Sequence, residues 1–190
     1  MIELNKIYNE DCLETMRRMA DNSVDLIVTS PPYNNGHAHR DNVRRKKNGG
    51  RDWRQKNYDC YADNKTQAEY EDWQREVISE CLRILKPSGN LFYNHKDILK
   101  NGCIVAPTWV YQFKVHQQIV WNRKSSVAND VHYFQPNAEY VYWIVKDTDA
   151  FYFDKSKAFL RQSVWDIPFE VNTKHPAPFP ERLVSNIVAC

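Results

Sequence analysis

The sequence predicts an α/β protein in which helices cover the faces of a sheet. Amphipathic helical patterns alternate with short runs rich in β-branched and aromatic residues, an order typical of this class. The first of these runs, Val24 to Thr29, ends at two successive prolines, and proline cannot continue a sheet ladder. Because α/β sheets hold ligands beyond the carboxyl ends of their strands, we expect the functional site where this strand ends.

The amino-terminal elements follow from the spacing of apolar residues. Residues 6–8 form a short segment of alternating polarity, and the pattern that begins at residue 11 places Leu13, Met16 and Met19 on one helical face. The polar residues 21–23 end this helix. The strand predicted after them is the one that leads into the prolines.

A longer helix is predicted over residues 67–86, with charged side chains opposite its apolar stripe. We expect the Pro-Ser-Gly sequence of residues 87–89 to end this helix. The apolar stripe consists of Tyr70, Trp73, Val77, Cys81 and Leu85.

The remaining elements are three strands and a short helix. Prolines in residues 175–180 precede the helix, which starts at Glu181, where an acidic side chain favours the first turn. An irregular stretch is expected around residues 163–165, and a polar connection over residues 122–137. The strands are predicted at 91–93, 115–121 and 140–145.

Composition limits the class of protein. With 190 residues, 42% of them hydrophobic, the chain can bury one core of ordinary size, so we expect a single unit over 1–190. A net charge of +2 excludes a histone-like polycation. The sequence shows no membrane span and no leader, which favours a cytoplasmic protein. The five cysteines lack a C-x-x-C and the histidines lack ligand spacing, so neither disulfides nor a metal site is expected.

The tetrapeptide at the end of the first strand, Ser30-Pro31-Pro32-Tyr33, has two interpretations. Two prolines fix the backbone, so the Ser30 hydroxyl and the Pro31 carbonyl can act as preorganised acceptors beside the flat face of Tyr33. Such a site suits a planar ring that bears an amino group. The alternative is a rigid turn with an exposed tyrosine.

Residues 24–34 (Val-Asp-Leu-Ile-Val-Thr-Ser-Pro-Pro-Tyr-Asn) resemble the catalytic motif of the DNA amino-methyltransferases. This family methylates exocyclic nitrogens of cytosine or adenine with S-adenosylmethionine. The resemblance implies that Ser30, Pro31, Pro32 and Tyr33 are the catalytic residues, and that the base is flipped out of double-stranded DNA. Ser30, where many adenine methylators carry aspartate, favours cytosine N4 over adenine N6.

Other segments extend the resemblance over nearly the whole chain. Residues 7–14 resemble the family's third-strand segment, which implies that Asp11 meets the adenine of the cofactor; taken alone, Asp11 is also a candidate helix cap. Residues 85–91 and 137–141 resemble the fifth-strand entry and the later hairpin. Residues 175–183 resemble the segment at the methionine end of the cofactor. The cofactor residues implied there are His175, Pro176, Ala177 and Phe179.

The order of these segments resembles the β-group of the family, whose members are circularly permuted. There a cofactor strand with an F-x-G-x-G signature follows the segment at 175–183, and the five glycines of this chain form no such signature. The resemblance implies a Rossmann-like S-adenosylmethionine-dependent methyltransferase sheet, circularly permuted and incomplete at the carboxyl terminus. We expect an open edge at Val24, Leu26 and Val28, covered by a second copy, by a complementing fragment with the F-x-G-x-G strand, or by residues 6–8.

Three functions are compared on this basis. The first is a site-specific DNA methyltransferase of the restriction-modification type. The second is a catalytically incomplete DNA-binding remnant, or one half of a split methyltransferase. The third is a methyltransferase acting on RNA or on a protein glutamine; such enzymes favour asparagine at the position of Ser30, and the permuted order also speaks against it.

Residues 37–56 form a basic segment with eight Lys and Arg side chains and two Asp. It is either a solvated excursion or a loop that contacts DNA phosphates near the flipped base. Residues 123–126 are a second, weaker candidate for DNA contact. The DNA-binding residues predicted in the basic segment are Arg40, Arg44, Arg45, Lys46, Lys47 and Arg51.

Overall fold

The computed structural model describes residues 2–34, 65–100, 102–124, 133–170 and 178–190. Three α-helices, seven strands and two short 3-10 helices are assigned in these ranges. The helices are α1 (Cys12–Arg17), α2 (Gln67–Ile84) and α3 (Glu181–Ala189), with η3 (Thr108–Gln112) and η4 (Lys155–Lys157). The strands are β1 (Val24–Thr29), β2 (Leu85–His95), β3 (Ile98–Lys100), β4 (Cys103–Val105), β5 (Val115–Asn122), β6 (Ala138–Val145) and β7 (Val164–Asp166).

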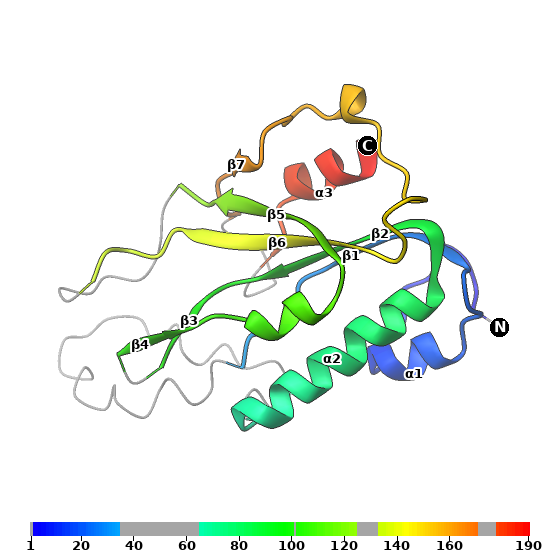
Figure 1. Ribbon diagram of the computed structural model, residues 1–190, viewed down its shortest axis with the longest axis horizontal. Coiled ribbons are helices and arrows are strands. Elements are labelled where there is room, and N and C mark those ends of the chain that lie inside the picture. Colours follow the sequence, from blue (N-terminus) through cyan, green and yellow to red (C-terminus); the bar gives the residue numbers. More distant parts are fainter. Residues whose placement is uncertain (1, 35–64, 101, 125–132, 171–177) are drawn as a thin grey trace.

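Five strands form the main sheet, in the order β1-β2-β6-β5-β7 (Figure 1). β1 and β2 are parallel, β6 is antiparallel to both β2 and β5, and β7 is parallel to β5. β3 and β4 pair in a separate hairpin. Among the described strands, β1 has a neighbour on one side only.

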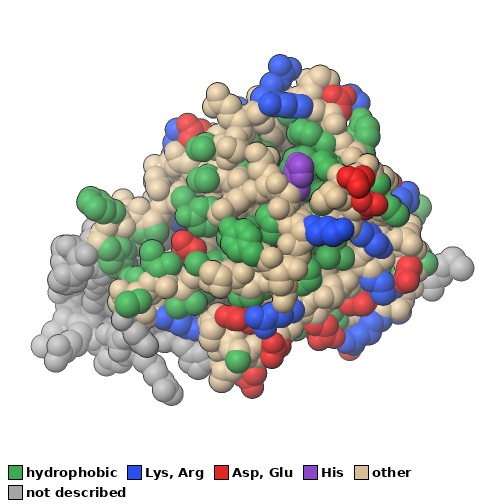
Figure 2. Space-filling model, viewed as in Figure 1, with side chains coloured by type: hydrophobic (Ala, Val, Ile, Leu, Met, Phe, Trp, Pro, Cys, Tyr) green, Lys and Arg blue, Asp and Glu red, His purple; other side chains and the backbone are tan. Residues whose placement is uncertain are grey.

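Helices cover both faces of the sheet. α1 and α2 lie on one face and α3 on the other (Figure 1). Alternate residues of a strand point to opposite faces, so Leu91 and Tyr93 of β2 join the core under α2, whereas Phe92 joins the core under α3. Figure 2 shows acidic and basic side chains interleaved over α1 and α2, as expected for the solvent face of amphipathic helices.

Side-chain caps define where α1 and α2 begin. The Asp11 carboxylate accepts from the Leu13 backbone N–H at 2.8 Å at the start of α1. Thr66 and Glu69 form a reciprocal capping box at the start of α2. Such caps satisfy backbone donors that have no partner within the helix.

The boundary between α2 and β2 differs from the prediction. The helix ends at Ile84, and β2 begins at the next residue without the predicted break at residues 87–89. Pairing with β1 jumps from Val24–Leu85 to Leu26–Asn90, so the Pro-Ser-Gly sequence forms a bulge inside β2. Proline is tolerated at a bulge because the ladder is already interrupted there.

Other expectations were met to different degrees. The strands predicted at 115–121 and 140–145 are confirmed, as is the helix start at Glu181. The first helix is shorter than its pattern, and the stretch expected to be irregular contains β7. Residues 6–8 form no strand, so the alternative in which they pair with the β1 edge is wrong. No helix in the described part of the chain has the length and apolar character of a membrane span.

Candidate active site

The carboxyl ends of β1 and β2 lie beside the amino end of β6 at one end of the sheet. Thr29 pairs with Tyr93 in the parallel β1–β2 ladder, so the segment 30–33 leaves β1 next to Asn94. β6 runs antiparallel to β2 and begins at the same end, which places Glu139 there. The topology therefore brings together side chains that are far apart in the sequence.

Hydrogen bonds join four of these side chains into one cluster, the Ser30–Glu139 network. The Tyr33 hydroxyl lies 2.8 Å from Ser30 Oγ and donates to Glu139 Oε2 at 3.0 Å. Asn94 Nδ2 donates to the Tyr33 hydroxyl at 2.5 Å and to Glu139 Oε2 at 2.8 Å, and it lies 3.4 Å from Ser30 Oγ. The serine and tyrosine of the tetrapeptide are thus held by an amide and a carboxylate from two other strands.

Arg123 compensates the negative charge of this network. Its guanidinium donates to Glu139 Oε1 at 3.0 Å and to the Pro136 carbonyl at 2.9 Å. The Glu139 side chain is 7% exposed and that of Arg123 is 21% exposed. A carboxylate buried to this degree is costly unless it is paired and hydrogen-bonded, and here both conditions are met.

Tyr33 is kept protonated by its surroundings. Burial raises the pKa of Tyr33 well above its usual value, and the nearby charge of Glu139 raises this pKa further. Ionising the phenol would place a second negative charge beside the first. The hydroxyl therefore remains a hydrogen-bond donor as well as an acceptor at neutral pH.

Aromatic and polar groups also fix the backbone of the tetrapeptide. The Tyr33 ring lies 4.9 Å from the His95 ring, and Lys96 Nζ lies 5.1 Å from the Tyr33 ring centroid. The Tyr70 hydroxyl is 2.9 Å from both the Pro32 carbonyl oxygen and His95 Nε2. Burial lowers the pKa of His95 to about 4, which leaves this imidazole neutral at pH 7.

The arrangement presents one exposed hydroxyl on a rigid support. Ser30 is exposed. The Tyr33 hydroxyl, in contrast, points into the Ser30–Glu139 network, where it donates to Glu139. Asn34, the next residue, is buried with a φ of 54° and donates to the Lys65 carbonyl. No hydrogen bond within the described ranges uses the Pro31 carbonyl. Ser30 Oγ is therefore a fixed acceptor that a ligand can reach.

The other predicted site residues lie elsewhere. Asp11 is an exposed cap of α1, as the simpler interpretation of its position predicts. Phe179 is partly buried beside Trp121, with ring centroids 6.1 Å apart, just before α3. The remaining predicted residues lie outside the described residues: His175, Pro176, Ala177, Arg40, Arg44, Arg45, Lys46, Lys47 and Arg51.

Sequence reasoning missed Asn94, Glu139 and the site role of Arg123. One signal was available for Glu139, because it is the only charged residue in β6, a strand that is otherwise apolar or aromatic. A lone acid in a buried strand requires a partner. Arg123 belongs to the segment taken as a weaker DNA-contact candidate, and the structure commits its guanidinium to Glu139 instead.

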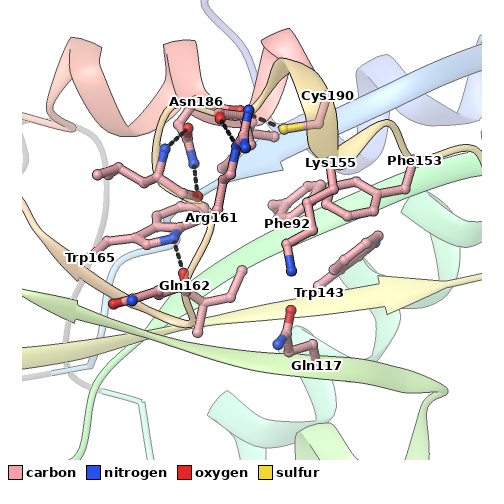
Figure 3. Close-up of a pocket in the computed structure, with 14 residues that line it drawn as sticks. Phe92, Gln117, Trp143, Phe153, Lys155, Arg161, Gln162, Trp165, Asn186 and Cys190 are labelled. Atoms are coloured by element: carbon pink, nitrogen blue, oxygen red, sulfur yellow. Dashed lines mark hydrogen bonds between the residues drawn. The ribbon is translucent and has the colours of Figure 1, made fainter.

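Two cavities lie on the α3 side of the sheet, away from the Ser30–Glu139 network. The smaller, of about 110 Å³, contains the aromatic side chains of Phe92, Trp143 and Phe153 beside Lys155 (Figure 3). The larger, of about 430 Å³, borders β1 and the end of α3. It is lined by residues that include Asp25, Leu26, Asn90, Phe92, Val188 and Cys190.

Comparison with known proteins gives a consistent result. Residues 24–190 match a family model described as DNA methylase. The type II methyltransferase M.BglII of Bacillus subtilis is 30% identical over 158 residues, which cover 79% of this chain. The chain spans only 38% of the length of that relative.

Several solved structures are similar to this chain in fold. The cytosine-N4-specific PvuII DNA methyltransferase superposes with a TM-score of 0.70 at 18% identity, covering 96% of this chain and 68% of that one. A Thermus thermophilus protein, described as a DNA modification methylase and complexed with S-adenosyl-L-methionine, gives a TM-score of 0.59 at 21% identity. The match covers 93% of this chain and 70% of that protein.

Proposed function

The chain belongs to the DNA methylase family, and from this premise we propose that it methylates an exocyclic amino nitrogen of double-stranded DNA. The methyl group comes from S-adenosylmethionine, and the target is N4 of cytosine or N6 of adenine. The observation that carries the proposal is the exposed Ser30 hydroxyl fixed at the sheet end by Tyr33, Asn94 and Glu139.

The proposed chemistry follows from the target nitrogen. The lone pair of an exocyclic amine is delocalised into the ring, and acceptors for its hydrogens localise that pair for attack. Ser30 Oγ and the Pro31 carbonyl are the two acceptors proposed here. The base leaves the duplex stack to reach them, and the partly exposed Tyr33 ring is the surface on which it stacks. In this proposal the site works by positioning and by fixed hydrogen-bond acceptors.

S-adenosylmethionine, when bound, supplies an electrophilic methyl on a sulfonium. Asp11 fits a role in holding it, because its exposed carboxylate is fixed by the bond to the Leu13 N–H while its other oxygen takes part in no hydrogen bond of the described residues. A ribose hydroxyl or the adenine amine can donate to that oxygen. Phe179, with His175, Pro176 and Ala177, completes the proposed cofactor set. The Thermus thermophilus neighbour, complexed with this cofactor, supports the proposal.

Duplex DNA is the proposed partner, and the basic segment 37–56 is its proposed contact. That segment lies outside the described residues. Support comes from its charge and from its position in the sequence, directly after the tetrapeptide. Phosphate contacts of this kind set affinity and orientation without reading sequence. A cytoplasmic location belongs to the same proposal, because the enzyme must reach both DNA and cofactor.

We also propose that a further strand pairs with the open edge of β1. No described strand pairs with this edge of β1, and an edge with unpaired backbone groups is a template for another strand. The cavity of about 430 Å³ beside Asp25 and Leu26 provides room for side chains of an added strand. Its proposed source is a second copy of the chain, or a complementing fragment with the F-x-G-x-G strand.

The proposed function is tested by incubating the chain with S-adenosylmethionine that carries a tritiated methyl group and with unmethylated duplex DNA. Tyr33→Ala removes base stacking worth about 1–3 kcal/mol and should lower the rate of transfer by about 5- to 150-fold without changing cofactor affinity. Tyr111→Ala is the matched control, because Tyr111 is 54% exposed on η3 and its hydroxyl donates to Gln118 on β5, outside the Ser30–Glu139 network. Its activity should equal that of the wild type.

The outcomes separate the competing functions. Methyl transfer by Tyr33→Ala at the wild-type rate would show that the tetrapeptide is not part of the base-binding site. DNA binding without transfer by the wild type would favour the incomplete remnant. If activity then returned on addition of a fragment with the F-x-G-x-G strand, the chain would be one half of a split enzyme. Label in RNA or in protein instead of DNA would favour the third function.

A further inference from the structure

We propose that Glu139, charge-compensated by Arg123, is a positioning residue that sets the direction of the hydrogen bonds in the site, so that Ser30 offers only lone pairs to the target amine. This inference rests on the proposed function. Glu139 touches neither the reacting nitrogen nor the methyl group in this account. It acts on Ser30 through the hydroxyl of Tyr33.

The direction follows from counting protons at Tyr33. A phenol has one proton to donate, and both Glu139 Oε2 and Ser30 Oγ lie within reach at 3.0 and 2.8 Å. If the proton pointed to Ser30, the phenol oxygen would face a carboxylate oxygen at 3.0 Å with no proton between them. If it points to Glu139, the bond is charge-assisted. The phenol oxygen then accepts the proton of Ser30.

Asn94 enforces the same direction. Its amide nitrogen donates to Tyr33 at 2.5 Å and to Glu139 at 2.8 Å, whereas its oxygen is buried without a hydrogen-bond partner in the described structure. Rotating the amide by half a turn would place that oxygen against the Glu139 carboxylate. The observed orientation is favoured although it leaves the Asn94 amide oxygen unpaired, because the flipped amide would repel the Glu139 carboxylate. Tyr33 therefore receives one bond from Asn94 and one from Ser30, and gives one to Glu139.

The consequence appears at Ser30, the exposed end of the chain of hydrogen bonds. Its proton is directed inward to Tyr33, so the lone pairs of its oxygen face the ligand side. Donating a hydrogen bond also makes a hydroxyl a better acceptor, because chained hydrogen bonds polarise one another. An amino group that donates N–H is accepted here, whereas a keto group at the same place would find no donor at Ser30. The carboxylate that sets this polarity lies on β6, more than a hundred residues from the tetrapeptide.

The test compares Glu139→Gln with Glu139→Asp and with the control Glu76→Gln, an exposed glutamate on α2. Glutamine carries its own donor and no charge, so it no longer fixes the direction of the Tyr33 proton. We expect the kcat for methyl transfer to unmethylated DNA to fall by about 10- to 100-fold, the range typical of one hydrogen bond to a charged group. KM values for DNA and cofactor should change less than about twofold. Glu139→Asp keeps the carboxylate, so its kcat should lie between those of Glu139→Gln and the wild type. The kcat of the control Glu76→Gln should equal that of the wild type.

A second readout does not depend on turnover. In the wild type, nuclear magnetic resonance should show the Tyr33 hydroxyl proton in slow exchange and close to the Glu139 side chain. Its exchange should be at least about tenfold faster in Glu139→Gln. A proton found beside the Ser30 β-protons instead would overturn the inference, as would an unchanged kcat in Glu139→Gln. A rise of the KM for DNA or cofactor in Glu139→Gln by the same factor as the fall in kcat would also overturn it, since it indicates a merely structural glutamate. If the wild type transfers no methyl group, the proposed function fails, while the position of the proton still decides the polarity.

Discussion

The ion pair between Arg123 and Glu139 gives a quantitative prediction for stability. Replacing Arg123 with Met removes the positive charge but keeps most of the apolar stem. At the observed separation of 3.0 Å, an effective dielectric constant of about 20 gives an attraction of about 5.5 kcal/mol. Desolvation of the guanidinium offsets part of this, and Tyr33 and Asn94 still donate to the carboxylate. We therefore expect Arg123→Met to lower the free energy of unfolding by about 3 kcal/mol.

The assay is urea unfolding followed by tryptophan fluorescence, analysed by linear extrapolation. Removing the orphaned charge as well, in the double variant Arg123→Met with Glu139→Gln, should restore about 2 kcal/mol relative to Arg123→Met. Arg17→Met is the control, because the Arg17–Glu76 pair at 2.8 Å has side chains 58% and 51% exposed. Exposed pairs contribute less than about 1 kcal/mol. A loss below about 1 kcal/mol for Arg123→Met, or a double variant no more stable than this single variant, would refute the reasoning.

Three further predictions concern DNA binding, assembly and pH. Replacing Arg44, Arg45, Lys46 and Lys47 with Ser should weaken the salt dependence of duplex binding, measured by fluorescence anisotropy. The slope of the logarithm of the binding constant against the logarithm of the salt concentration should fall in magnitude by about 1 for each lost phosphate contact. An unaltered slope would mean that the segment is only solvated. Light scattering at micromolar concentration should show self-association through β1, and a monomer whose amides at residues 24–28 are protected from exchange would contradict it. His95, with a folded pKa of about 4 against an ordinary 6.5, should destabilise the fold by about 3 kcal/mol as the pH falls from 6.5 to 4. This penalty is absent above pH 6.5, where the folded and unfolded chains are both neutral at His95, and it is complete below about pH 4, where both are protonated. His95→Gln should lack this part of the acid sensitivity in unfolding experiments, and identical pH profiles would exclude the assignment.

Local patterns in the sequence were sufficient for elements that one segment specifies. The strand before the tetrapeptide ends where proline removes a ladder donor, and α3 begins after a run of prolines with Glu181 in its first turn. Asp11 caps α1 through a neighbouring residue, so its position alone predicted that contact. These features depend on residues within a few positions of one another, which is the range that spacing arguments cover.

Features that depend on pairing between distant strands were not predictable in the same way. The bulge at residues 87–89 arises because β2 continues beside β1, whereas Pro and Gly in isolation indicate a helix end. Gly89 sits where an added Cβ would lie 2.8 Å from the Asp25 carbonyl oxygen, so its role is close strand packing. Tertiary contact here overrides the local signal.

The candidate site shows the same division. Ser30 and Tyr33 were identified from the tetrapeptide, but the partners that fix them come from β2, β6 and the end of β5. Only the strand order β1-β2-β6-β5 brings Asn94, Glu139 and Arg123 to one place. A single charged residue in an apolar strand signals a buried partner, yet the sequence does not say which basic residue provides it.

The most direct test of the central claim is the identity of the methylated nucleoside. Unmethylated duplex DNA is incubated with the chain and S-adenosylmethionine, digested to nucleosides and analysed by mass spectrometry, with Ser30→Ala assayed beside the wild type. We expect N4-methylcytosine or N6-methyladenine nucleosides from the wild type, and a loss of at least about tenfold in Ser30→Ala, because one fixed acceptor for the amine is gone. Methylation at a ring carbon, or equal yields from the two proteins, would contradict the claim that Ser30 receives an exocyclic amine.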